Sequence, residues 1–155
     1  MIRAAIPSDA AQIAAIWNHA IRETTITFNP VEKPEEEVAT LTAQDCLVWE
    51  EDGRIMGFAR YFPFRGGEGY RFTVEHTIML HDEGHGNGAG RRLMEALCAH
   101  AKAEGKHSMF AGCSAENRGA VAFHARLGFQ EVATLPEVGF KFGRWIDLVL
   151  MQKFL

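Results

Sequence analysis

The stretch Gly84-His85-Gly86-Asn87-Gly88-Ala89-Gly90 decides how the chain is interpreted, because it places four glycines in seven residues. It lies between an apolar run, TVEHTIML (73–80), and a helical pattern, RRLMEALCAHAKAEG (91–105). Glycine is costly to order, so such density indicates a close approach to the backbone. A glycine-rich turn that leads from a strand into a helix exposes unpaired N–H groups and the positive end of the helix dipole. The stretch therefore predicts an anion site suited to phosphate.

Two well-known phosphate motifs fit this stretch poorly. A P-loop requires a Lys-Ser or Lys-Thr pair after its glycines, and none follows here. A dinucleotide fingerprint can be read as Gly84-x-Gly86-x-x-Ala89. However, three expected strands and two expected helices precede it, whereas that motif opens a βαβ unit. The remaining interpretations are a pyrophosphate loop of the coenzyme A type and a simple flexible turn.

Composition and charge restrict the class of protein. The chain has 155 residues, of which 47% are hydrophobic and 23% charged, so we expect a single domain over 1–155. A net charge of −4 gives no reason to expect a nucleic acid or an anionic membrane as a partner. No run approaches the roughly 18 apolar residues of a membrane span, and no signal peptide is evident.

The cysteines and histidines do not suggest a metal site. Cys46, Cys98 and Cys113 are widely spaced and odd in number, which favours reduced thiols in the cytoplasm over disulfides or zinc. His81 and His85 have the i, i+4 spacing of a helical metal pair, but the glycines beside them argue against a helix. We therefore expect no metal.

Apolar periodicity predicts an α/β fold with a mixed sheet. Strands are expected at 2–6, 46–50, 55–63, 70–80, 108–114, 131–135 and 145–152, and helices at 7–21, 34–43, 91–105 and 117–128. Asp9 and Gln12 have the spacing of a capping box for the first helix. The order β-α-α-β-β-β-α-β-α-β-β indicates a mostly antiparallel sheet with helices on its faces.

Several motifs together resemble the GNAT superfamily of N-acetyltransferases. The signature Q/R-x-x-G-x-G/A appears as His85-x-x-Gly88-x-Gly90, with His85 in place of Gln or Arg. The resemblance narrows to the branch of phosphinothricin and methionine sulfone/sulfoximine N-acetyltransferases, and it spans nearly the whole chain. The segments that carry it are IWNHAI, RFTVEHTIML, GKHSMFAG, ENRGAVAFHARLGF and VGFKFGRWIDLVLMQ.

The resemblance implies a fold, a cofactor and a reaction. It implies the GNAT fold, with a central twisted, mostly antiparallel sheet flanked by helices. Acetyl-CoA is the implied co-substrate and a small amino acid or its analogue the implied acceptor, by direct attack in a ternary complex. It also implies a homodimer, with the last strands as the candidate interface. Acetylation of another amine and a non-catalytic acyl-CoA sensor remain alternatives.

Two segments are expected to hold the coenzyme. The backbone of the strand end before the loop should bind the pantetheine arm, and the amides of the loop should bind the pyrophosphate. The expected residues are Ile78, Met79, Leu80, Gly86, Asn87, Gly88, Ala89, Gly90 and Arg91. Asn117 opens the last helix, where it can act as N-cap, and the resemblance implies that it also bonds to pantetheine.

The acceptor side is expected around Glu75. Its carboxylate lies in an apolar strand, where burial would raise its pKa and make it a better base for the amine. Arg71 is four residues earlier, which would place it on the same strand face to bind an α-carboxylate; pairing with a nearby glutamate is the alternative. Thr73 and Phe28 are further candidate substrate contacts.

His124 is the remaining catalytic candidate. The tyrosine that many GNAT enzymes use to protonate the thiolate is absent from the last helix, where His124 occurs instead. The resembled branch also has a histidine there. It could act as an acid, position the sulfur, or serve only the structure.

Overall fold

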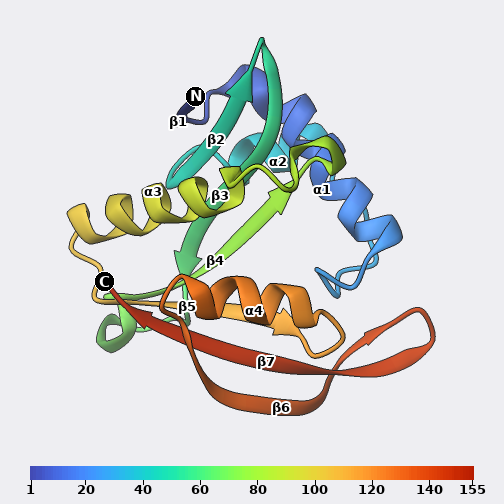
Figure 1. The fold of residues 1–155 in the computed structure, drawn as a ribbon, viewed down its shortest axis with the longest axis vertical. Coiled ribbons are helices and arrows are strands. Elements are labelled where there is room, and N and C mark those ends of the chain that lie inside the picture. The colour runs from blue at the N-terminus through green and yellow to red at the C-terminus, as the bar shows by residue number, and fades with distance from the viewer.

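A seven-stranded sheet is the centre of the computed structural model, which describes residues 1–155 (Figure 1). The strand order is β1-β2-β3-β4-β5-β7-β6, and every neighbouring pair is antiparallel except β4 and β5. The strands are β1 (Ile2–Ala4), β2 (Cys46–Glu51), β3 (Arg54–Pro63), β4 (Thr73–Leu80), β5 (Ser108–Ser114), β6 (Gln130–Lys141) and β7 (Arg144–Phe154). The helices are α1 (Ala10–Glu23), α2 (Glu35–Leu41), α3 (Ala89–Ala103) and α4 (Arg118–Arg126), with short 3₁₀ turns η1 (Pro7–Asp9), η2 (Glu68–Tyr70) and η3 (Asp82–Gly84). The predicted order of elements and the mixed sheet are confirmed.

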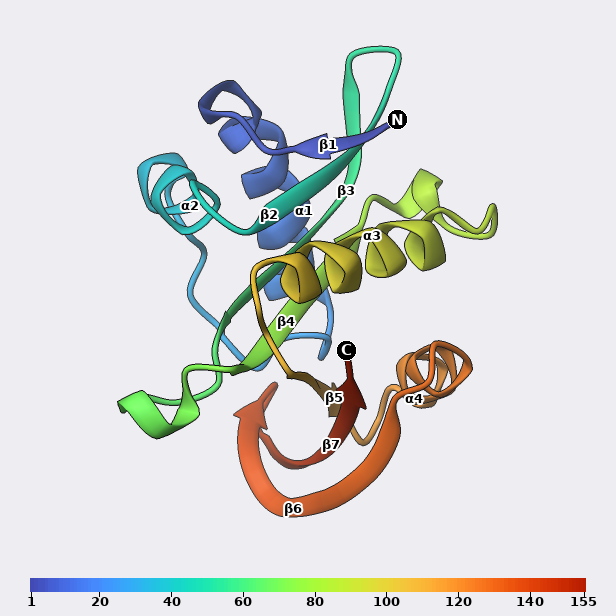
Figure 2. The same cartoon turned by 90° about the vertical axis from the view of Figure 1, so that its left-hand side faces the viewer.

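The helices cover the two faces of the sheet in pairs, α1 with α2 and α3 with α4 (Figure 2). Side chains alternate along each strand, so each strand supplies apolar groups to both layers. Phe58 and Met79 belong to the layer under α1, whereas Ala59 and Val74 belong to the layer under α3 and α4. No helix is long and apolar enough to cross a membrane.

The two central strands, β4 and β5, pair only briefly. Their register runs from Thr73↔Ser108 to Glu75↔Phe110 and then stops. Beyond that point β4 continues alongside β3 as far as Leu80, and β5 continues alongside β7 as far as Ser114. The strands therefore diverge as a V, which is visible in Figure 1.

The outer strand β6 curls around the end of the sheet (Figure 2). Its register with β7 shifts between Leu135 and Gly139, a bulge at which Glu137 adopts a φ of 53°. The Glu137 amide donates to Asp147 Oδ1 at 2.8 Å, which holds the bulge. Bulges bend a strand and redirect its side chains, so the last residues of β6 point toward the chain that follows α1.

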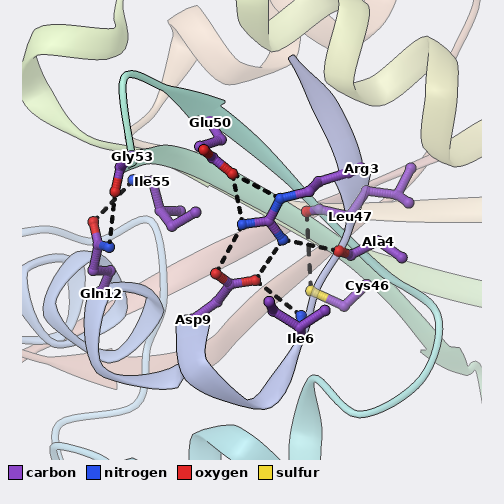
Figure 3. A network of polar contacts seen from close by, with 10 residues as sticks. All are labelled: Arg3, Ala4, Ile6, Asp9, Gln12, Cys46, Leu47, Glu50, Gly53 and Ile55. Carbon is purple, nitrogen blue, oxygen red and sulfur yellow. Dashed lines mark hydrogen bonds and ion pairs between the residues drawn. The ribbon is translucent and has the colours of Figure 1, made fainter.

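An ion-pair network fixes the N-terminal strand (Figure 3). Arg3 binds Glu50 at 2.7 Å and the buried carboxylate of Asp9 at 2.8 Å, and Asp9 also accepts the Ile6 amide. The predicted capping box is wrong, because Asp9 makes no cap bond to α1. Gln12, its supposed partner, instead accepts from the Ile55 amide at 2.9 Å.

We expect the substitution Asp9→Ala to lower the free energy of unfolding by about 2–3 kcal/mol, because it leaves the Arg3 guanidinium without its buried partner. Urea unfolding followed by circular dichroism measures this. The matched control is Glu32→Ala, which removes an exposed ion pair with Arg22 and should cost less than about 1 kcal/mol. Equal losses in both variants would show that the network does not fix the strand.

Candidate active site

The glycine stretch forms the N-terminus of α3, as predicted. Gly86 and Gly88 have φ values of 89° and 78°, which side chains rarely adopt, and Gly88 is the N-cap. Asn87 Oδ1 accepts a hydrogen bond from the Ala89 amide at 3.0 Å. This amide, one of the expected phosphate donors, is therefore already paired. The other amides of the loop have no hydrogen-bond partner in the protein; they belong to Gly86, Asn87, Gly88, Gly90 and Arg91. This is the geometry of an anion site.

The end of β4 leads directly to these amides. Ile78, Met79 and Leu80 all lie beyond the last residue of β4 that pairs with β5. Their backbone pairs with β3 on one side only. The other edge is therefore available to an extended ligand arm, while the buried Met79 side chain packs under α1. A free backbone edge and side-chain packing coexist here, because strand alternation separates the two.

Glu75 stands where the V opens. It is the last β4 residue that pairs with β5, and its side chain points to the face covered by α1, opposite to Val74 and His76. Its Oε2 lies 3.5 Å from the position a side chain on Gly112 would take. Burial alone raises the pKa of the Glu75 carboxyl, and no protein group donates a hydrogen bond to it. The carboxylate is thus free to accept a proton.

Phe28 is on the same face of the sheet as Glu75. Its ring covers Gly139, so closely that a Cβ there would lie 2.5 Å from a ring carbon. Gly139 pairs with Ile146, which is two residues from Leu148 on β7. Leu148 in turn lies over Gly112, beside the Glu75 carboxylate. Phe28 and Glu75 therefore lie on one face of the sheet, on the two sides of the Ile146–Leu148 segment of β7.

Arg71 is not where the sequence predicts it. The strand begins at Thr73, so Arg71 precedes it and does not share a strand face with Glu75. Its Nη1 donates to the Glu68 carbonyl at 2.8 Å, and the guanidinium lies 4.3 Å from the centre of the Phe72 ring. The predicted position is wrong because the 3₁₀ turn Glu68–Tyr70 delays the start of the strand from residue 70 to Thr73. Thr73 does lie on the face of Glu75, two residues before it.

Asn117 and His124 belong to α4, across the sheet from Glu75. Asn117 is the N-cap, and its Oδ1 accepts the Ala120 amide at 3.0 Å, as expected. His124 is buried and spans the V: its Nδ1 is 3.6 Å from Cys113 Sγ on β5, and its Nε2 is 3.0 Å from His76 Nε2 on β4. Local sequence reasoning does not single out His76, because its partner is 48 residues away.

The hydrogen bonds assign the protons of this histidine pair. His124 Nδ1 is 2.7 Å from the Ala120 carbonyl, which can only accept, so Nδ1 carries a proton. Neutral His124 then accepts at Nε2 from His76 Nε2–H, and the buried His76 Nδ1 has no partner. Burial holds the pKa of His76 at about 3 and lowers that of His124, so both rings are neutral at physiological pH.

No group of three His, Cys, Asp or Glu side chains is placed to hold a metal ion. His81 and His85 do not share a helix, because they flank the 3₁₀ turn η3. His81 Nδ1 instead accepts the Glu83 amide at 3.2 Å.

The neutral histidine pair predicts acid sensitivity. His76 takes up a proton in the unfolded chain as the pH falls through 6.5, but in the folded protein only near about 3. Stability contributed by the neutral ring is therefore lost as the pH falls below 6.5, by on the order of 2 kcal/mol near pH 5. In His76→Gln, whose amide can still donate to His124, thermal unfolding should depend less steeply on pH. An unchanged pH slope would contradict the assignment.

Known proteins share both the sequence and the architecture of this chain. Residues 13–129 match the model of the acetyltransferase (GNAT) family. The L-amino acid N-acyltransferase MnaT of Escherichia coli (strain K12) is 40% identical over 97% of this chain and 91% of that protein. The L-methionine sulfoximine/L-methionine sulfone acetyltransferase of Salmonella typhimurium is 38% identical over 97% of this chain and 92% of its own length.

A solved structure adds the cofactor. The acetyltransferase yncA of Salmonella typhimurium, determined with its cofactor acetyl-CoA, superimposes with a TM-score of 0.96 and 37% identity over 100% of this chain and 93% of that one. The free amides before α3 and the open edge of β4 fit a phosphate-bearing, extended cofactor of this kind. This chain belongs to the GNAT family and is an acetyl-CoA-dependent N-acetyltransferase.

Proposed function

We propose that the protein transfers acetyl from acetyl-CoA to the α-amine of a small amino acid or analogue, of the methionine sulfone, methionine sulfoximine or phosphinothricin type. The observation that carries this proposal is the half-buried, unbonded Glu75 carboxylate at the opening of the V. The names of the relatives support the class of acceptor. Residues 1–155 act as one domain in this scheme.

In this proposal the cofactor and the acceptor bind to different parts of the V. The unpaired loop amides, those of 86–88, 90 and 91, bind the diphosphate. The free edge of Ile78–Leu80 aligns the pantetheine arm so that a main-chain N–H can donate to the thioester oxygen. Asn117 adds a hydrogen bond from the start of α4. The thioester carbon then faces the sheet side on which Glu75 and Phe28 lie.

The reaction is a direct attack. Glu75 takes a proton from the ammonium, directly or through one water, and the free amine attacks the thioester carbon. A C–N bond forms, the C–S bond breaks, and the leaving thiolate takes up the proton released from nitrogen. Both ring nitrogens of His124 are already hydrogen-bonded, which favours a positioning role near the sulfur over the role of acid. Thr73 borders the acceptor, and Phe28 forms the far wall.

A thiol-release assay with acetyl-CoA against amino acids and their oxidised sulfur analogues tests the acceptor class. Turnover of amino acids supports the proposal, and turnover of polyamines, antibiotics or peptide termini alone would replace it. Binding of acetyl-CoA with no release of thiol, whichever amine is offered, would indicate an acyl-CoA sensor without transferase activity.

We expect Glu75→Gln to lower kcat by about 10²–10⁴-fold while acetyl-CoA binding is retained, since only proton transfer is removed. In the wild type, kcat/KM for the acceptor falls as the pH is lowered through the raised pKa of Glu75, because the protonated carboxyl cannot act as a base. The residual activity of the variant should lack this decline. Glu131→Gln, on the exposed face of β6, is the control and should retain full activity. A variant as fast as the wild type would exclude Glu75 as the base.

We also propose a homodimer in the cytoplasm. The cysteines are unpaired thiols, which favours the cytoplasm. The hairpin of β6 and β7 exposes large apolar side chains, namely Val138, Phe140, Phe142 and Trp145. A water-exposed cluster of this kind favours burial against a second copy.

Size-exclusion chromatography with light scattering should therefore give a dimer at micromolar concentration. We expect Trp145→Asp to shift it toward the monomer, because a charge would be buried in the interface. The control Phe154→Asp changes an exposed ring at the far end of β7 and should leave the dimer intact. A monomeric wild type would contradict the proposal.

A further inference from the structure

A buried ammonium group lies beside the segment that ends at Phe28, the proposed far wall of the acceptor site. Lys141, at the end of β6, is 2% exposed, yet no carboxylate lies within ion-pair distance of it. Its Nζ donates to the main-chain carbonyls of Thr24 at 2.6 Å and Thr27 at 2.7 Å. Burial of an unpaired charge is costly, so these two short bonds must hold the ammonium firmly.

The end of α1 compensates the charge. Thr24 is the C-cap of this 14-residue helix, so its carbonyl lies at the negative end of the helix dipole. The ammonium therefore joins the last strand pair to the chain that follows α1, across 117 and 114 positions of sequence. The joined segment continues into Phe28, one residue after Thr27.

The same strand receives the Phe28 ring. Gly139 is two residues before Lys141, so both point to the same side of β6. A Cβ at Gly139 would lie 2.5, 2.6 and 2.9 Å from three ring carbons of Phe28, so only glycine leaves room for the ring in this position. The bulge at Glu137 directs this part of β6 toward Phe28.

We propose that Lys141 and Gly139 form a latch that fixes Phe28, and thereby sets the size of the acceptor amino-acid side chain that the enzyme accepts. The latch rests on the proposed function, because Phe28 is taken as a wall of the acceptor pocket. Lys141 and Gly139 are positioning residues: they act on the acceptor through Phe28, one by hydrogen bonds to its segment and the other by leaving space for its ring.

The first test is Lys141→Met, which keeps the length of the side chain and removes the ammonium. We expect the KM of the acceptor to rise about tenfold or more, the KM of acetyl-CoA to change less than about twofold, and the preference between short and long amino-acid acceptors to flatten. Lys153→Met is the matched control. Lys153 also donates to a carbonyl at the end of a helix, that of Leu127 after α4, and its loss should leave acceptor selectivity unchanged. A parallel rise of both KM values in Lys141→Met would overturn the proposal.

The second test is a double-mutant cycle. Gly139→Ala should raise the KM of the acceptor in the wild-type background, because the new methyl displaces the Phe28 ring. In a Phe28→Ala background the same substitution should have no further effect. An equal effect in both backgrounds would show that Gly139 does not act through Phe28.

A third measurement does not depend on turnover. Amide hydrogen exchange in segment 24–29 should accelerate in Lys141→Met and stay at the wild-type rate in Lys153→Met. Unchanged exchange in Lys141→Met would exclude the latch whatever the substrate. Accelerated exchange, in an enzyme that acetylates no amino acid, would retain the latch and reject the proposed acceptor.

Discussion

The site depends on the early end of pairing between β4 and β5 after Glu75 and Phe110. A parallel pair in the middle of a sheet normally continues, since unpaired backbone groups in the interior are costly. Here each strand follows its other neighbour, β4 with β3 and β5 with β7, so both keep one complete ladder while the space between them opens. The free edge that results is the feature that an extended thioester arm requires.

The divergence also explains why the site has two different sides. Strand alternation sends Glu75 toward α1 and its neighbour His76 toward α4, on opposite faces of the same strand. On the second face His124 reaches from β4 to β5 and closes the V with neutral, hydrogen-bonded rings. On the first face Glu75 has no such partner, and its carboxylate remains available. On the α4 face the V is thus filled by His124, whereas on the α1 face the Glu75 carboxylate is unpaired.

The parts of the site that depend on residues close together in the sequence can be predicted from the sequence alone. The glycines before α3, the Asn117 cap and the burial of Glu75 follow from residue type and spacing over a few positions, and the structure has them as expected. Arg71 lies outside β4 because the strand that periodicity predicts from residue 70 begins only at Thr73, after the turn at Glu68–Tyr70. His76 with His124, and Lys141 with Thr24, join residues 48 and 117 positions apart, and nothing in the neighbourhood of either residue indicates its partner.

The end of β6 contributes side chains both to the interior, near Phe28, and to the exposed outer surface. The inward residues of β6 near its end are Gly139 and Lys141, which contact the chain after α1, and the residue between them, Phe140, is exposed on the outside. Adjacent residues of a strand cannot move independently, because a shift of backbone register displaces both faces together. The bulge at Glu137 allows this end of β6 to bend away from the flat sheet and reach Phe28. Any contact that holds Phe140 on the outside therefore also restrains Gly139, Lys141 and the Phe28 ring on the inside.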